Sequence, residues 1–164
     1  MGLMKSFKAY QAAGTPPQHY DCYSRAKPLM CNAVAFDDFG TFDTTQFCYV
    51  APYAQRMEFH VNLLWNAPQD GYAFAAHLML NQLGTTGGAP GGEFAGYDRT
   101  VNEKYTNMHE SMQVTQIIDL AAGDKVWAVA TVTLGGAGCN LTGSVAGNGH
   151  ITTNYFTGKE LKVL

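Results

Sequence analysis

Short apolar runs with a period of two constrain the fold of this chain more than any other feature. The clearest run, residues 57–65, places five apolar side chains on one face: Met57, Phe59, Val61, Leu63 and Trp65. Strict alternation over a run of this length is the pattern of a half-buried β-strand. Similar runs recur from Asn32 onward, separated by Gly, Asp, Asn and Pro, which is typical of an all-β sandwich or barrel.

Further strands are predicted over residues 72–80, 112–120, 125–134 and 151–163. The first of these runs is rich in alanine, so a helix remains an alternative there. Residues 121–124 (Ala-Ala-Gly-Asp) predict a tight turn between the second and third runs. The last run is a closing strand whose predicted core residues are Phe156, Leu161 and Val163 and whose predicted solvent-facing residues are Lys159, Glu160 and Lys162.

The run at residues 125–134 is apolar on both faces. Val126, Ala128, Ala130 and Val132 form one face, and Trp127 and Val129 make the other face apolar as well. An antiparallel strand with water on one side is normally polar on that side. We therefore expect Trp127 and Val129 to form a second apolar contact face, covered by another subunit, by the N-terminal segment or by a docking partner. A tryptophan lying under a neighbouring loop is the alternative.

The first thirty residues differ from the rest of the chain. Phe7, Tyr10, Tyr20 and Tyr23 are interspersed with prolines, and neither a helical nor a strand period persists. We predict an irregular N-terminal arm over residues 1–30, with one helical turn near residues 5–13, followed by a single domain over residues 31–164. Aromatic side chains in such an arm need a surface to pack against. That surface is either the arm's own domain or a partner.

Charge and hydropathy exclude several partners. Ten Lys and Arg against 13 Asp and Glu give a net charge of −3, without the basic field that binding to nucleic acid requires. The longest strongly apolar run, residues 72–80, is about half of what spans a bilayer. The first eight residues lack the apolar core of a secretory signal, so we expect a cytosolically made chain. Charged residues make up only 14%, against about 25% usually, which indicates a surface made up of neutral polar groups and glycine or covered by other protein.

The sequence predicts no catalytic, cofactor-binding or metal-ligating residue, so we expect a protein that is not an enzyme. The four cysteines lack a C-x-x-C pair, and whether Cys22 and Cys31 form a disulfide stays open. Asp37 and Asp38 are neighbours, and neighbouring strand residues point to opposite faces rather than converging as acid and base. Residues 84–92 are glycine-rich but lack the Gly-Lys-Ser/Thr of a phosphate-binding loop, which favours an ordinary loop.

Three ordered segments resemble the complement-component-one-q and tumour-necrosis-factor superfamily of trimeric jelly rolls, over residues 31–164. Asp37, Phe42, Tyr49 and Phe59 stand at the separations of that family's signature, although Cys31, Gln55, Met57 and Val61 depart from its aromatic and glycine positions. Residues 43–52 resemble its hairpin ending in Ala-Pro, residues 116–126 its penultimate hairpin, and residues 154–161 its final strand.

The resemblance implies two stacked antiparallel sheets, a jelly-roll sandwich, and a homotrimer around a threefold axis. Alternation places His60, Ile117 and Tyr155 on the outward side of the sheet that resembles the family's inner one. We expect these three residues at the trimer interface.

Phage virions use the same jelly roll in capsid decoration proteins and in tail-fibre knobs. A short arm rather than a stalk favours a homotrimeric decoration, or cement, protein that clamps neighbouring subunits of the major capsid protein and stabilises the phage head. The arm residues Phe7, Tyr10, Tyr20 and Tyr23 are then the expected capsid contacts. The expected location is the outer capsid surface, after assembly in the host cytoplasm. The alternative is a receptor- or glycan-binding knob that uses residues 84–96 and Tyr97.

Overall fold

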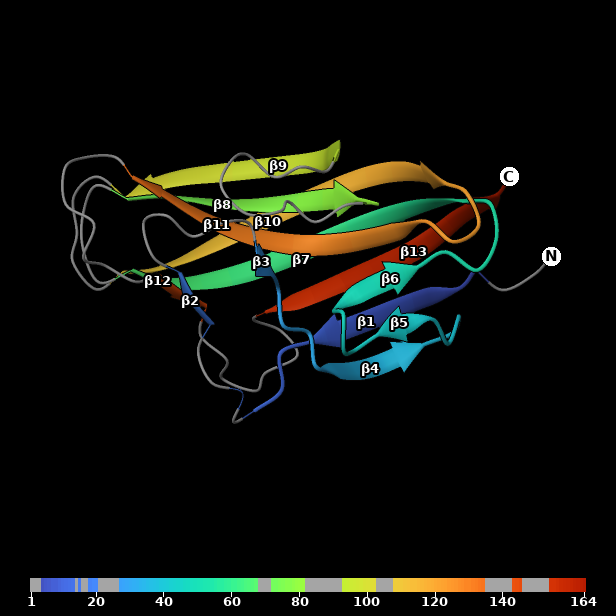
Figure 1. Ribbon diagram of the computed structural model, residues 1–164, viewed down its shortest axis with the longest axis horizontal. Coiled ribbons are helices and arrows are strands. Elements are labelled where there is room, and N and C mark those ends of the chain that lie inside the picture. The colour runs from blue at the N-terminus through green and yellow to red at the C-terminus, as the bar shows by residue number, and fades with distance from the viewer. Residues whose placement is uncertain are drawn as a thin grey trace.

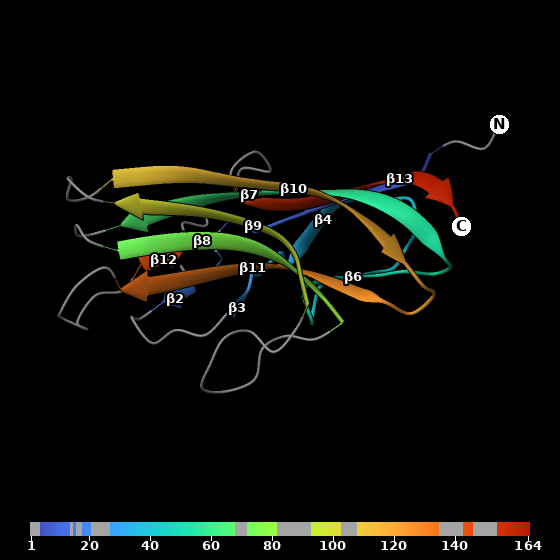
Figure 2. The ribbon, with the colours of Figure 1, turned by 90° about the horizontal axis from the view of Figure 1, so that it is seen from above.

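The structure is a computed structural model that describes residues 4–13, 15, 18–20, 27–67, 72–81, 93–102, 108–134, 143–145 and 154–164. Every regular element in these ranges is a β-strand, and the strands form two antiparallel sheets, which we call sheet A and sheet B (Figure 1). Viewed from above, the sheets are stacked layers, with β7 and β10 in one and β6 and β11 in the other (Figure 2). The predicted two-sheet jelly-roll sandwich is confirmed.

The order of the strands brings the two ends of the chain together. Sheet A consists, in spatial order, of β2 (Gln18–Tyr20), β12 (Gly143–Val145), β7 (Gln55–Ala67), β13 (Tyr155–Val163), β1 (Ser6–Tyr10) and β4 (Ala33–Asp37), with β10 (Met108–Leu120) also paired to β7. Sheet B consists of β5 (Phe42–Asp43), β6 (Cys48–Val50), β11 (Lys125–Leu134), β8 (Tyr72–Leu80) and β9 (Glu93–Asn102), with β3 (Lys27–Pro28) paired to β11. The early strand β1 therefore pairs directly with the last strand, β13.

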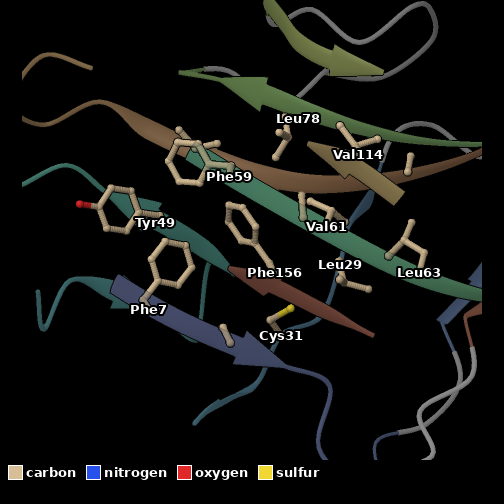
Figure 3. Packing of buried hydrophobic residues seen from close by; sticks show 14 of the residues in the cluster. Phe7, Leu29, Cys31, Tyr49, Phe59, Val61, Leu63, Leu78, Val114 and Phe156 are labelled. Carbon is tan, nitrogen blue, oxygen red and sulfur yellow. The ribbon is translucent and has the colours of Figure 1, made fainter. Parts of the chain in front are cut away.

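The core between the sheets follows from the alternation seen in the sequence. On β7, the side chains of Met57, Phe59, Val61 and Leu63 are fully buried. Figure 3 shows the rings of Phe7, Tyr49, Phe59 and Phe156 gathered between the sheets, with the aliphatic residues farther along β7. Aromatic rings at these separations gain from edge and stacking geometry beyond their buried area. This aromatic cluster joins β1, β6, β7 and β13 across the two sheets.

Gly158 on β13 leaves room for this cluster. A Cβ atom at this position would collide with the Phe7 ring and would lie 3.0 Å from both the Met57 methyl carbon and a ring carbon of Phe59. Any larger side chain would force the rings off their positions, because a close-packed core has no space to give. The glycine thus permits the stacking of β1 on the rest of the core.

The N-terminal prediction is wrong for residues 6–10. The predicted helical turn near residues 5–13 is instead strand β1, which lies between β13 and β4 in sheet A. Phe7 and Ala9 on this strand are fully buried, and so are Leu29 and, almost completely, Cys31 beyond it. The sandwich therefore includes part of the predicted arm over residues 1–30. The local sequence does not predict strand β1, because its partner β13 lies far away in the sequence.

The strand predictions elsewhere are confirmed, with one correction at the end of β13. Residues 72–80 form strand β8 and not a helix. On β13, Phe156 is buried as predicted, but Val163 is 60% exposed and Glu160 is buried, where it accepts a hydrogen bond from the Tyr53 hydroxyl. The register of β13 against β7 shifts between Glu160 and Lys162. Glu160 lies before this shift and shares the inward side of β13 with Phe156, so plain alternation buries it, whereas Val163 pairs with the buried Gln55 but is exposed at the end of the strand.

The predicted turn after β10 is confirmed, and Asp124 holds it in place. The backbone amide of Ala121 donates to the Asp124 carboxylate, and Gly123 adopts a φ of 88°, which suits a glycine. The same carboxylate accepts a hydrogen bond from the side-chain amide of Asn81, at the end of β8. The turn therefore ties β10, β11 and β8 together at one end of the molecule.

Candidate functional site: the outer face of sheet A

The side of sheet A that faces away from the core carries three cross-strand rows of side chains. We call this side the outer face of sheet A. The middle row consists of Phe36, Lys8, Thr157, His60 and Thr115, and the rows on either side consist of Ala33, Tyr10, Tyr155, Asn62 and Gln113, and of Ser6, Lys159, Glu58 and Ile117. Residues directly opposite one another on antiparallel strands have neighbouring side chains. These rows therefore form one continuous surface.

His60 is the centre of a hydrogen-bonded group on this face. Its Nδ1 lies 2.7 Å from the Thr115 hydroxyl, and its Nε2 lies 3.1 Å from the Tyr155 hydroxyl. The ammonium group of Lys8 lies 4.4 Å from the centre of the Tyr155 ring, a cation–π contact. The four side chains come from β1, β7, β10 and β13, so the pairing of four strands assembles the group.

The polar side chains of this face are largely satisfied by one another. Both ring nitrogens of His60 have partners, and the Gln113 side-chain amide donates to the Asn62 carbonyl oxygen at 3.0 Å. Partial burial lowers the pKa of His60, an effect that Glu58 opposes and Lys8 reinforces. Neutral, hydrogen-bonded side chains lose little when water is removed from around them. The neutral group around His60 can therefore be covered by another protein surface at low cost, whereas Lys8, Lys159 and Glu58 on the same face need charged or polar partners.

Apolar and charged residues complete the outer face. Ile117 is 53% exposed and pairs with Glu58, while Phe36 is 46% exposed at the edge strand β4. Nearer the start of β7, Arg56 and Asp119 form an exposed ion pair in which two guanidinium nitrogens donate to the two carboxylate oxygens. The centre of the face is thus polar and aromatic, with exposed apolar side chains beside it.

The three residues predicted for a trimer interface lie together on this face. His60 and Tyr155 are in direct contact, and Ile117 stands in the row next to His60. Their role in trimer contact stays a prediction. Lys8, Thr115 and Phe36 belong to the same face but were not identified from the sequence, because only the register of β1, β4 and β10 places them there.

The predicted capsid contacts of the arm need correction. Phe7 is fully buried in the core and has no surface with which to contact a partner. Tyr10 is half-buried on β1, on the outer face of sheet A beside Tyr155, and not on a separate arm. Tyr20 falls in β2, but its side chain and the whole of Tyr23 lie outside the described residues. The paired strand β1 replaces the predicted loose segment because it completes the sheet between β13 and β4.

The predicted second apolar contact face is also wrong. Trp127 and Val129 are 6% and 0% exposed in the single chain, where they form a small cluster with Cys48 and Met79 on the outer side of sheet B. The indole N–H of Trp127 donates to the Gln46 carbonyl oxygen in the turn before β6. The chain itself covers this face. This agrees with the alternative prediction of a tryptophan that lies under a neighbouring loop.

His77 on β8 pairs with Val129 on this covered side of sheet B, and it makes the fold sensitive to acid. Burial lowers the pKa of His77 to about 4. The unfolded chain binds a proton near pH 6.5 and the folded chain does not, so stability falls as the pH drops from 6.5 to 4. We expect the free energy of unfolding to fall by about 3 kcal/mol over this window. Urea unfolding of wild type and of His77→Gln should show this loss in the wild type only.

Among the described residues, other chemistry is sparse. Cys31 and Cys48 are buried free thiols, and burial raises the pKa of Cys48 to about 11, so both are protonated and unreactive at neutral pH. Cys22 lies outside the described residues. Where the structure is described, no three His, Cys, Asp or Glu side chains are grouped to hold a metal ion. The described part of the chain also contains no helix of the length and apolarity that crossing a bilayer requires.

Comparison with known proteins places this architecture in one class, the jelly-roll domains of the tumour-necrosis-factor and complement C1q type. A tumour necrosis factor, Eiger, from S. frugiperda superposes with a TM-score of 0.63 at 13% identity, over 98% of this chain and 94% of its own. The globular domain of zebrafish complement 1qA gives 0.58 at 14% identity, over 98% and 99%. Murine APRIL gives 0.62 at 8% identity, over 96% and 99%.

At these identities the likeness establishes the fold and nothing finer. No protein-family model matches the sequence, and no curated protein matches it. The chain thus has the jelly-roll fold of these domains, as its sequence motifs predicted. Information on function comes from the surface of this chain.

Proposed function

We propose that the chain acts as a homotrimer assembled through the outer face of sheet A, and that this trimer is a structural protein of a phage virion. In this role it decorates the outer surface of the capsid, contacts the major capsid protein and stabilises the head. In this role the chain binds other proteins and catalyses no reaction.

The main support for trimer formation is the hydrogen bonding among polar side chains on the outer face of sheet A. His60, Thr115 and Tyr155 hydrogen-bond one another, so a second copy that covers them has to pair only the one hydroxyl hydrogen that the neutral imidazole leaves over. Beside them, Ile117 and Phe36 are about half exposed, and burial of the remaining apolar surface is worth roughly 1 kcal/mol each. The jelly rolls that the sequence resembles form trimers, which supports a threefold arrangement here.

Attachment to a capsid is supported by a second set of exposed apolar residues. Met4, Val163 and Leu164 are 61%, 60% and 52% exposed. Met4 precedes β1 and Val163 ends β13, and the start of β1 and the end of β13 lie at the same end of the molecule (Figure 1). In a trimer, three such ends face one underlying surface. Three weak contacts held together bind far more tightly than one, because the second and third form at high effective concentration.

Two measurements test the proposal. Light scattering coupled to size-exclusion chromatography should give three times the chain mass of 17.8 kDa. Co-expression with the major capsid protein of the same genome should then yield capsids that carry the chain at their local threefold positions in image reconstructions. A double variant, Val163→Lys with Leu164→Lys, should stay trimeric but leave capsids bare, whereas Lys162→Ala should decorate them normally.

The outcomes separate the alternatives. A stable monomer contradicts the trimer. A trimer that leaves capsids bare but binds glycans or cells contradicts the decoration role and supports the receptor-binding knob.

A further inference from the structure

His60 is placed where a change of protonation would act on the proposed trimer interface. It lies in the middle row of the outer face of sheet A, and both of its ring nitrogens are engaged, one by the Thr115 hydroxyl and one by the Tyr155 hydroxyl. A neutral imidazole offers one donor and one acceptor, and an imidazolium offers two donors and a charge. Protonation therefore changes both the hydrogen bonding and the charge of this face.

The charged groups around His60 set how well a proton is tolerated there. Glu58 precedes it by two residues on β7, Lys8 lies on β1, and Lys159 lies on β13 beside Glu58. On β10 the facing residues are Thr115 and Ile117, and the nearest charge, Asp119, is already paired with Arg56. Tyr155 is the remaining titratable neighbour. Burial is the largest cause of the lowered pKa of His60, and the opposing effects of Glu58 and Lys8 partly cancel.

Partial burial in the single chain already lowers the pKa of His60. Covering the same face with a second copy would remove more water and disfavour the charged ring further. A threefold axis would repeat the effect at three sites. Acid would then act against the assembled state more than against the single chain.

We propose that His60 is a pH switch of the trimer: the trimer is stable when all three His60 rings are neutral, and it dissociates into folded single chains when they become protonated. The inference rests on the proposed assembly through the outer face of sheet A. Its consequence is a decoration that holds at neutral pH and is released in mild acid.

The sign and size of the effect follow from linkage. Dissociation takes up as many as three protons per trimer, so the trimer dissociation constant rises by up to about 10³-fold per pH unit below the pKa of His60 in the free chain. The ordinary histidine pKa of about 6.5 is an upper limit for that onset, because the ring is already partly buried in the single chain. The switch therefore works below pH 6.5.

Sedimentation velocity of the full-length protein between pH 7.5 and 5.0 tests the switch, with near-ultraviolet circular dichroism at each pH to confirm that the chain stays folded. Wild type should be trimeric at pH 7.5 and should dissociate in the acid range. His60→Gln, which has no titrating ring, should show a trimer dissociation constant that no longer rises over this pH range, whatever its value at pH 7.5.

Two charge variants show whether the titrating group is His60. Lys8→Gln removes a repelling cation and should move dissociation to higher pH, whereas Glu58→Gln removes the compensating carboxylate and should move it to lower pH. A side chain that only packs at the interface would not respond in opposite directions. His77→Gln, on the other sheet, should leave the dissociation curve in place.

The possible failures are distinguishable. A monomer at pH 7.5 overturns the proposed trimer and this inference with it. A trimer that persists in acid, or one whose His60→Gln variant dissociates at the same pH as wild type, overturns the switch alone and leaves the trimer standing.

Discussion

Replacing Phe7 with alanine is expected to lower the free energy of unfolding by about 3–5 kcal/mol. The ring is fully buried, lies parallel to the Tyr49 ring with 4.9 Å between centroids, and meets the edge of Phe156 at 5.2 Å. Its removal would leave a cavity at the junction of the two sheets, where β1 and β13 cannot move inward without breaking their pairing. Urea unfolding followed by tryptophan fluorescence measures the loss.

The same variant separates two roles for the N-terminal segment. Met4→Ala, at a side chain that is 61% exposed, should change the free energy of unfolding by less than about 0.5 kcal/mol. If Phe7→Ala were as stable as wild type but failed to bind capsids, Phe7 would be a partner contact and its place in the core would be wrong. A destabilised Phe7→Ala chain confirms that β1 belongs to the sandwich.

The sequence predicted the long central strands because their alternation is local. Met57 and Phe59 on β7 are buried as the pattern required, and residues 121–124 form the expected turn. On β1 only Phe7 and Ala9 point inward, and two inward side chains are too few to define a period. The partners that make this segment a strand lie about 150 residues away on β13, so its identity depends on a non-local pairing that no local pattern contains.

The candidate site was predictable in part for the same reason. Alternation along one strand places His60 on the outward side of β7, and it does the same for Ile117 and Tyr155 on their own strands. Which outward side chains touch depends on register between strands. That register brings Lys8 over the Tyr155 ring and Thr115 to the His60 ring, and neither contact has a sequence signal. The outer face of sheet A could be predicted as a surface, but the contacts among its side chains could not.

Ile117→Lys is expected to convert the trimer into a folded single chain. In the single chain the new ammonium would lie opposite Glu58 on β7, so a favourable cross-strand pair would replace an exposed apolar side chain, and the free energy of unfolding should change little. In the trimer three such charges would be covered. Loss of roughly 1 kcal/mol of apolar burial at each of three copies raises the trimer dissociation constant by about 10²-fold, and the cost of covering three ammonium groups raises it further.

Sedimentation equilibrium over a range of protein concentrations measures that constant, and Val163→Lys is the matched control. Val163 is also apolar and 60% exposed, but it lies at the end of β13 where the chain terminates, away from the His60 row. The control should therefore remain trimeric. Wild-type association of Ile117→Lys would mean that copies of the chain meet through another surface.

The two variants together also test why threefold assembly matters for attachment. Ile117→Lys keeps Met4, Val163 and Leu164 intact, so each single chain retains its apolar end but presents only one copy of it. Without the effective concentration supplied by two linked neighbours, its binding to capsids should fall by about 10²-fold or more. Val163→Lys should lose capsid binding while keeping the trimer. Loss of binding by both routes, one through assembly and one through the contact itself, is the result that a multivalent clamp requires.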